Sequence, residues 1–227
     1  MSNFDIGQFI LYMVALIFSL SLHEAGHAWM SNRFGDDLAR SQGRITLNPV
    51  SHVDPIGTLL FPAIAFFTGA PLLGWARPTP VNPLAWRNKR VANIWVSAAG
   101  VIGNFFIAGV AGIALRVLFE LGMIEGSTGE LLPAFSESGV AVGAIKLLEV
   151  FFRMNVVLAV FNLIPIPPLD GSKILGSLLP ESFEAAIESV EQYGMILLFV
   201  AVFTGAFGAI FRFVMPLAYQ IIFIGRI

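Results

Sequence analysis

The chain has 227 residues, of which 56% are hydrophobic and only 12% charged, and its mean hydropathy is +0.80. This composition lies far from that of soluble globular proteins and indicates an integral membrane protein. The net charge of −2 and the 13 scattered lysines and arginines form no basic stripe, which argues against a nucleic-acid partner. Because the chain has no cysteine, disulfides, thiolate metal sites and cysteine nucleophiles are excluded. Apolar stretches run from end to end, so we expect a single membrane domain over residues 1–227.

Four stretches are long and apolar enough to cross a bilayer as helices, since each crossing needs about 20 residues. They cover residues 6–31, 94–119, 139–161 and 193–224. The sequence therefore predicts a membrane all-α fold with about four full transmembrane helices. A lipid bilayer is the expected environment of all four.

Residues 53–75 form a fifth apolar stretch, which three prolines and three glycines interrupt. Such a segment either crosses the membrane or dips into it and returns where protein shields its backbone. Arginines and lysines follow both the first span and residues 53–75, whereas residues 120–138 carry four glutamates and no basic side chain. Because basic connections stay in the cytoplasm, a full crossing would put the two basic connections on opposite sides. We therefore predict a re-entrant segment at 53–75.

Two short segments differ from the apolar stretches around them. Residues 38–50 (LARSQGRITLNPV) and 76–83 (ARPTPVNP) alternate in part and carry proline and asparagine near their ends. Proline restricts a strand to the edge of a sheet. We expect short extended strands or loops here, at the membrane surface.

The first span ends in the motif HEAGH, at residues 23–27. His23 and His27 are four residues apart, so on a helix they project from one face and can bind a single zinc ion through imidazole nitrogens. Glu24 lies beside the first histidine but is turned away from direct ligation, where it can take a proton from an activated water. The alternative is a group of polar side chains that snorkel at a helix end, with Glu24 as a surface charge.

A catalytic zinc site needs a third protein ligand and an open fourth position. The third histidine of the chain, His52, is best interpreted as a surface residue in a loop, although it could also gate the site or bind an additional ion. A carboxylate is offered by Asp170, in the segment FNLIPIPPLDGSKIL at residues 161–175. Its prolines prevent a helix, and Gly171 permits a tight bend. For an isolated Asp-Gly pair, an ordinary turn between helices would be the alternative.

HEAGH and the later stretch NLIPIPPLDG, at residues 162–171, together resemble the two signatures of the site-2 proteases, which are intramembrane zinc metalloproteases. Three further segments resemble the compact prokaryotic branch of that family, which lacks an accessory soluble domain: NPVSHVDPIGT from Asn48, GWARPTPVNP from Gly74 and AAGVIGNFF from Ala98. The resemblance therefore covers most of residues 20–175.

The resemblance implies a zinc endopeptidase with one catalytic Zn²⁺, held by His23, His27 and Asp170, and with Glu24 as the general base. Its expected substrates are single-span membrane proteins or signal-peptide remnants. All three ligands must lie at one depth, and a re-entrant segment at 53–75 leaves two full crossings between the motifs. Asp170 then returns to the side of the histidines. We expect the site to open to the cytoplasm, in the cell membrane of a prokaryote.

Three further polar residues could position the substrate. Asn162 could bond the developing oxyanion or could cap the preceding helix end. Asn104 lies beside two glycines in a span, where substrate contact and an interhelical hydrogen bond explain it equally well. His52 is the third candidate. Because a substrate helix must be unwound before cleavage, an edge strand at 40–47 or 76–82 could hold it extended by strand addition.

Two other functions compete with proteolysis. A membrane metal transporter could line its path with histidine and aspartate, but it would not need the glutamate of HEAGH, and such proteins often show internal repeats, which we do not find here. A catalytically inactive scaffold of the same family is the second alternative, but Glu24 is intact.

Overall fold

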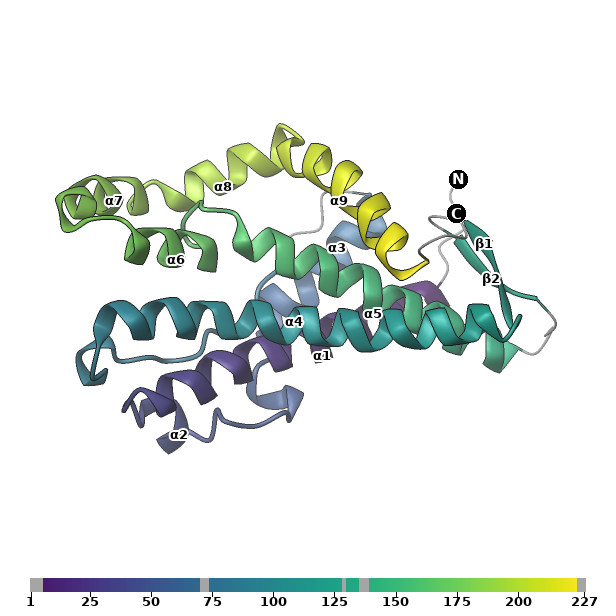
Figure 1. Cartoon of the computed structure of the whole chain (residues 1–227), viewed down its shortest axis with the longest axis horizontal. Coiled ribbons are helices and arrows are strands. Elements are labelled where there is room, and N and C mark those ends of the chain that lie inside the picture. Colours follow the sequence, from purple (N-terminus) through teal and green to yellow (C-terminus); the bar gives the residue numbers. More distant parts are fainter. Residues whose placement is uncertain (1–5, 70–73, 128–129, 135–138, 224–227) are drawn as a thin grey trace.

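Three long helices pack against one another and form the body of the protein (Figure 1). They are α1 (Ile6–Arg33), α4 (Lys89–Glu120) and α5 (Gly139–Leu163). This computed structural model describes residues 6–69, 74–127, 130–134 and 139–223. The helix α4 begins where the Asn88 side chain accepts a hydrogen bond from the backbone N–H of Val91, which satisfies one of the free donors of its first turn.

Within the described residues, two helices, α1 and α4, are long and apolar enough to cross a membrane. The bent pair α8 (Gly194–Phe203) and α9 (Ala206–Ile222) raises the number to three if both halves count as one span. The helix α5 is 25 residues long, but it carries Lys146, Glu149 and Arg153. The predicted count of four full spans is therefore not confirmed, whereas the predicted mostly helical architecture is.

The last predicted span, 193–224, is broken rather than continuous. The helices α8 and α9 meet at an angle of 69°. Gly205 lies between them in the left-handed region, with φ of +77°, a conformation that glycine adopts without strain. A continuous helix is therefore the wrong prediction for this stretch.

Residues 54–69 and 74–75 form a hairpin whose two described arms meet at its base. A six-residue π-helical turn (Pro55–Leu60) leads into the eight-residue helix α3 (Phe61–Thr68), a combined length well below that of a span. The N–H of Trp75 donates to the carbonyl of Gly57 at 3.2 Å, and the Thr58 hydroxyl donates to the carbonyl of Trp75 at 2.8 Å. The two ends of the hairpin thus meet at one level.

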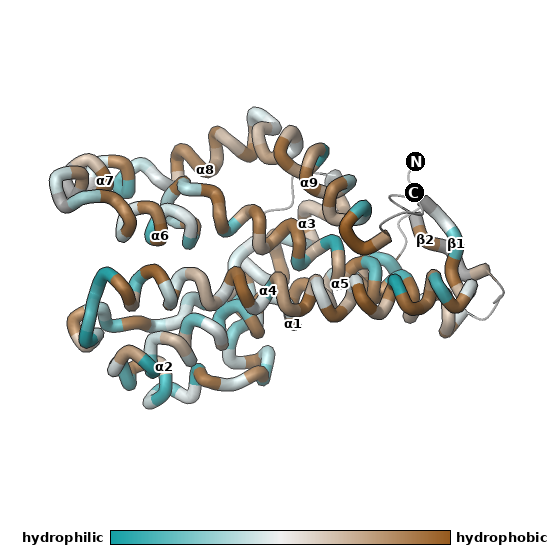
Figure 2. The backbone as a smooth tube through the Cα atoms, viewed as in Figure 1, coloured by the Kyte–Doolittle hydropathy of each residue, from teal (hydrophilic) through white to brown (hydrophobic). Residues whose placement is uncertain are grey.

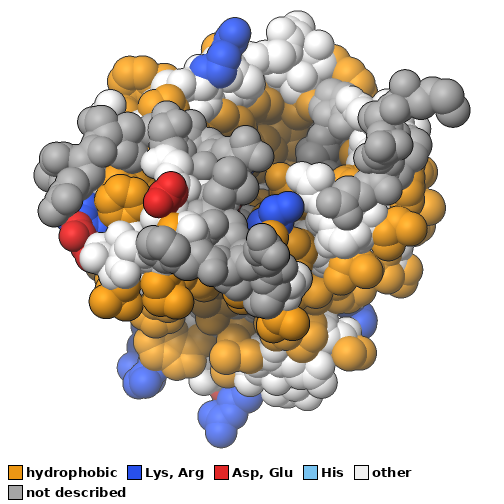
Figure 3. All heavy atoms as spheres, turned by 90° about the vertical axis from the view of Figure 1, so that its right-hand side faces the viewer, with side chains coloured by type: hydrophobic (Ala, Val, Ile, Leu, Met, Phe, Trp, Pro, Cys, Tyr) orange, Lys and Arg blue, Asp and Glu red, His pale blue; other side chains and the backbone are white. Residues whose placement is uncertain are grey.

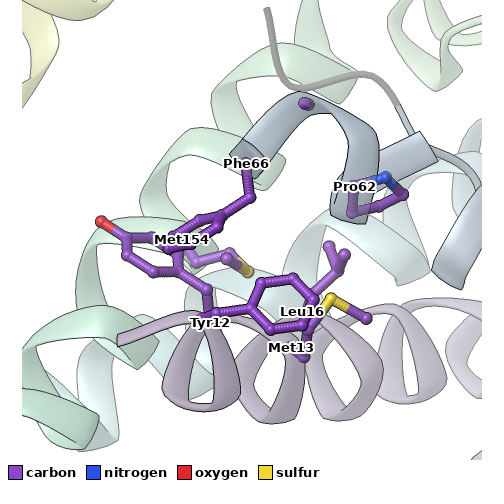
Figure 4. Close-up of a pocket in the computed structure, with 8 residues that line it drawn as sticks. Tyr12, Met13, Leu16, Pro62, Phe66 and Met154 are labelled. Carbon is purple, nitrogen blue, oxygen red and sulfur yellow. The ribbon is translucent and has the colours of Figure 1, made fainter. Parts of the chain in front are cut away.

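The helix α3 rests on α1 through aromatic contacts. The ring of Phe9 lies 5.0 Å from that of Phe66 and 5.4 Å from that of Phe67, centroid to centroid. Beneath α3 is an apolar cavity of about 210 Å³, in which side chains of α1, α3 and α5 face one another (Figure 4). Its lining is Phe9, Tyr12, Met13, Leu16, Pro62, Ala65, Phe66 and Met154.

The strands predicted at 38–50 and 76–83 are absent from the described structure. The first segment contains the short helix α2 (Leu38–Ser41) and a 3-10 turn (Pro49–Ser51), and the second ends in a 3-10 turn (Pro83–Ala85). Residues 76–82 run without a partner strand, because two of them are prolines that cannot donate to a ladder.

The described sheet is instead an antiparallel hairpin in the acidic connection, formed by β1 (Ile124–Ser127) and β2 (Glu130–Pro133). Ile124 and Leu131 are buried against Phe223, at the end of the molecule where α1 begins and α9 ends (Figure 1). Hydrophilic residues gather at the opposite end, around α2 and the start of α4 (Figure 2). Hydrophilic residues are thus concentrated at the end of the bundle that contains α2 and the start of α4 (Figure 2).

The remaining helices lie over the hydrophilic end of α4. They are α6 (Asp170–Leu178), a 3-10 turn (Glu181–Phe183) and α7 (Glu184–Glu191). The guanidinium of Arg90, in α4, donates to the carbonyls of Ser177, Leu178 and Leu179, at 2.5 to 3.1 Å. These carbonyls end α6 without helical partners, so Arg90 caps α6 and anchors it on α4.

The contact between α1 and α4 depends on Gly26, where a Cβ atom would lie 2.8 Å from the Ala99 carbonyl oxygen. We expect Gly26→Ala to lower the midpoint of thermal unfolding in detergent, because a methyl group there forces the two helices apart. Gly103→Ala is the matched control on the same interface, since its Cβ would lie 3.5 Å from Leu22, an ordinary contact. Both substitutions gain about 1 kcal/mol of helix propensity. Equal midpoints for the two variants would contradict this account.

Candidate metal centre

His23 and His27 meet a carboxylate from a distant part of the chain. Their Nε2 atoms lie 3.0 Å apart, with the two rings edge to face. The Oδ2 atom of Asp170 lies 3.3 Å from each Nε2. One nitrogen or oxygen atom from each of the three residues falls within 4.8 Å of the others, and among the described residues this is the one such group that could hold a metal ion.

Hydrogen bonds on the far side of each ring fix the direction of the imidazoles. His23 Nδ1 lies 2.7 Å from the side-chain oxygen of Asn104. His27 Nδ1 lies 2.6 Å from the carbonyl oxygen of Val96. A carbonyl oxygen can only accept, so each Nδ1 carries a hydrogen, and the neutral form of each ring turns the lone pair of Nε2 towards Asp170.

Asn104 is itself held in one orientation. Its side chain is fully buried, and its amide nitrogen donates to the Asn155 side-chain oxygen at 2.9 Å and to the Ser19 carbonyl at 3.3 Å. Asn155 in turn donates to the Ser19 hydroxyl at 2.8 Å. The Asn104 oxygen therefore has to face His23. This network joins α1, α4 and α5 beside the histidines.

The donor set fits a zinc ion. Asp170 is 5% exposed, and its Oδ2 atom has no hydrogen-bond donor among the described residues. Two nitrogen lone pairs and this carboxylate oxygen face one another, which is repulsive unless a cation lies between them. Two imidazoles and one carboxylate, with a fourth position left open, are a common ligand set of catalytic zinc.

Asp170 reaches the histidines because α6 begins directly against the end of α5. The Asp170 residue is the first of α6, after a proline-containing turn that follows Leu163. A Cβ atom at Gly171 would lie 2.2 Å from the Leu163 carbonyl oxygen, so only glycine allows this approach. The Asp-Gly pair is thus the start of a helix and not a simple turn between two helices.

Gly100 provides the surface of α4 on which both rings lie. A Cβ atom there would be 2.6 Å from His23 Cε1 and from His27 Nε2. Any side chain at this position would occupy the space of the candidate ligand atoms. In the sequence Gly100 stands out only as a neighbour of Asn104, because its contacts with both imidazoles come from another helix.

Glu24 lies outside the group of candidate ligands and is held by a loop. Its Oε2 atom accepts a hydrogen bond from the backbone N–H of Thr79 at 2.8 Å. The Thr79 hydroxyl donates to the Glu24 carbonyl at 3.0 Å. The carboxylate thus has a fixed position beside the histidines without forming part of the metal group.

The remaining predicted residues lie in different places. Asn104 contacts His23 directly and is buried between helices, as the interhelical interpretation predicted. Asn162 donates to the carbonyl of Leu158 on its own helix, at 2.9 Å. His52 is 1% exposed and its Nε2 lies 2.8 Å from the Thr46 carbonyl, so its interpretation as a surface residue is wrong.

Comparison with known proteins supplies the family. The model of peptidase family M50 matches residues 11–205. The chain belongs to peptidase family M50. The resemblance to site-2 proteases is therefore confirmed, as are the predicted zinc cofactor and the metalloendopeptidase class, and the cluster of His23, His27 and Asp170 could bind the ion.

Individual relatives agree with this family. A Bacillus subtilis (strain 168) protein named "Putative zinc metalloprotease YwhC" is 38% identical over 188 residues, which cover 83% of this chain and 78% of that protein. The Mycolicibacterium smegmatis protein named "Putative zinc metalloprotease Rip2" is 30% identical over 201 residues, 88% of this chain and 70% of its own length. A Mycobacterium tuberculosis (strain H37Rv) protein of the same name is 29% identical over 86% of this chain and 67% of its own. No solved structure matches the chain.

The Asn104 hydrogen bond should contribute to metal affinity. In Asn104→Leu the His23 Nδ1–H loses its acceptor, so the ring is free to rotate or to change tautomer, and we expect about 10- to 100-fold weaker zinc binding. Competition with a chelator of known affinity measures the change. Asn155→Leu should have a smaller effect, because Asn155 touches Asn104 and not the ring. Unchanged zinc affinity in Asn104→Leu would contradict this role.

Proposed function

We propose that this protein is an intramembrane zinc endopeptidase that hydrolyses peptide bonds within or near transmembrane segments of single-span membrane proteins or signal-peptide remnants. His23, His27 and Asp170 are the zinc ligands, and Glu24 is the general base. The observation that carries the proposal is the convergence of two imidazole nitrogens and one carboxylate oxygen within 4.8 Å, beside α1 and α4, which are apolar enough to cross a membrane.

The surroundings of the site support cleavage inside the bilayer. Asn104 contacts His23, so it lies on α4 at the same depth as the histidines. Its sequence neighbours Ile102, Phe105 and Phe106 are exposed. Phe18 is exposed on α1. Hydrophobic side chains also cover much of the flanks in the view from the β-hairpin end (Figure 3). Large apolar side chains outside a buried polar site are typical of a protein that faces lipid at that depth.

The chemistry requires a base with a fixed position. Zinc, when bound, supplies a Lewis acid that polarises the scissile carbonyl and lowers the pKa of water. The Thr79 N–H binds Oε2 of Glu24, and the other carboxylate oxygen can take the proton of the attacking water and pass it to the leaving amine. Glu24 thus serves as base and then as acid in one cycle.

Strand addition at 76–82 does not fit this structure. Two residues of the segment are prolines without an N–H, and the N–H groups of Arg77, Thr79 and Asn82 are donated into the protein. An extended substrate would find few donors there to pair with. Residues 40–47 contain a helix and a turn. We therefore assign residues 76–82 to holding Glu24 and not to pairing with the substrate.

The hydrogen bonds that join Trp75 to Gly57 and Thr58 support a segment that re-enters the membrane and returns to the same side. The basic connections then share the cytoplasmic side, and so does the opening of the site. Water, which hydrolysis consumes, reaches the zinc from the cytoplasm in this arrangement. The cell membrane of a prokaryote is the membrane that the compact size and the relatives favour.

The reaction class is tested with Glu24→Gln and His27→Ala, co-expressed with tagged single-span membrane proteins. Glutamine keeps the shape of the side chain and accepts the Thr79 N–H, but it cannot take a proton. We expect Glu24→Gln to retain zinc and to lose cleavage by about 100-fold or more. His27→Ala should lose both zinc and cleavage. Cleavage at the parental rate by Glu24→Gln, or absence of cleavage by the parent, would refute the proposal.

The topology is tested with single cysteines, which the cysteine-free chain allows without further changes. We expect a cysteine at Arg87 to react with a membrane-impermeant maleimide only after the cytoplasmic side is exposed. A cysteine at Leu121, in the acidic connection, is the control and should react from outside. Both positions are exposed in the structure. Labelling of Arg87→Cys from outside alone would mean that residues 54–75 cross the membrane.

A further inference from the structure

The backbone N–H that binds Glu24 belongs to Thr79, in a loop segment that we call the strap (residues 76–82). Hydrogen bonds to other parts of the protein fix both ends of this strap. The N–H of Arg77 donates to the His52 carbonyl at 2.8 Å, and the N–H of Asn82 donates to the Asp36 carboxylate at 2.7 Å. Thr79 lies between these two points and bonds Glu24 through both its N–H and its hydroxyl. The position of the general base therefore depends on the position of the strap.

Arg44 holds the strap at the two residues before Thr79. Its Nη2 donates to the Arg77 carbonyl at 2.9 Å and to the Pro78 carbonyl at 2.7 Å, and its Nη1 donates to the Ser51 carbonyl. One guanidinium thus joins the strap to the loop that carries His52. A fork with several fixed donors holds such a set of carbonyls, whereas the ammonium of lysine is a single point charge.

Burying the charged side chain of Arg44 costs free energy, which its interactions have to offset. The residue is 5% exposed, and its side-chain hydrogen bonds given above all go to neutral carbonyl oxygens. Burial, together with the neighbouring Arg77, lowers the pKa of the Arg44 guanidinium, although the Glu24 carboxylate acts on this pKa in the opposite direction. A buried cation whose hydrogen bonds go only to neutral carbonyls is unfavourable unless those hydrogen bonds maintain a needed geometry.

We propose that Arg44 is a positioning residue for catalysis, which sets the strap so that the Thr79 N–H orients the carboxylate of Glu24. The inference rests on the proposed function of Glu24. Arg44 has no hydrogen bond or ion pair with His23, His27 or Asp170 among the described contacts. Its loss should therefore disturb the base and leave the metal site in place. A displacement of about 1 Å in a catalytic group can cost 100-fold in rate.

The experiment compares Arg44→Met with Arg40→Met, an exposed arginine of the same loop region. Both are purified in detergent with zinc and assayed on a tagged single-span membrane protein that the parent cuts. We expect Arg44→Met to lower kcat by about 10- to 100-fold, with KM within about twofold and the zinc content unchanged. Arg40→Met should match the parent, and Arg44→Lys should recover part of the lost kcat.

The outcomes separate this inference from the proposed function. Cleavage by the parent, lost in Glu24→Gln, tests the function, and only the Arg44 variants test this positioning role. Parental kcat in Arg44→Met would overturn the inference. Loss of zinc or of the folded state in that variant, without recovery in Arg44→Lys, would also overturn it, because Arg44 would then support the whole fold.

Thr79 variants test whether the effect passes through its N–H. Thr79→Val keeps the N–H and should retain most of kcat, whereas Thr79→Pro removes the donor and should lower kcat as Arg44→Met does. If both act through this one hydrogen bond, the double variant Arg44→Met/Thr79→Pro should be little worse than Thr79→Pro alone. Losses that multiply in the double variant would contradict the proposed route.

Discussion

Two imidazole lone pairs and one carboxylate oxygen are directed at the same point, and the rest of the site follows from this arrangement. The Nδ1 hydrogen bonds to Asn104 and Val96 turn both Nε2 atoms inward, and in the neutral rings their lone pairs face each other at 3.0 Å. Asp170 adds a buried oxygen with no donor of its own. In a medium of low dielectric constant this convergence is strongly unfavourable without a cation. The fold thus holds the three groups in a geometry that zinc binding can stabilise.

The metal group and the base are supported by different parts of the chain. The imidazoles are oriented by hydrogen bonds from α4, and α6 brings the carboxylate to them because Gly171 allows it to start against the end of α5. Glu24 is next to His23 in sequence, yet a loop holds its side chain through Thr79. This division of support means that the affinity for zinc and the rate of the chemical step can change independently.

Much of this could be predicted from the sequence where the signal is local. The four-residue spacing of HEAGH fixes the face that the histidines share, and the apolar lengths around 6–31 and 94–119 match α1 and α4. The bend at Gly205 is harder to predict, because a single glycine within a long apolar stretch is also compatible with a continuous helix. Burial of His52 and the roles of Asn155 and Thr79 depend on neighbours that are distant in sequence. No periodicity of the chain encodes such contacts, so only the folded structure provides them.

The most direct test of the converging lone pairs is X-ray absorption spectroscopy at the zinc edge of the purified, zinc-loaded protein. The account predicts one zinc ion per chain with two imidazole nitrogens at about 2.0–2.1 Å and oxygen ligands at about 2.0–2.2 Å. In Asp170→Asn the two imidazoles should remain, while the binding of zinc weakens. A spectrum with fewer than two imidazoles in the unaltered protein, or no zinc bound in stoichiometric amount, would contradict the account.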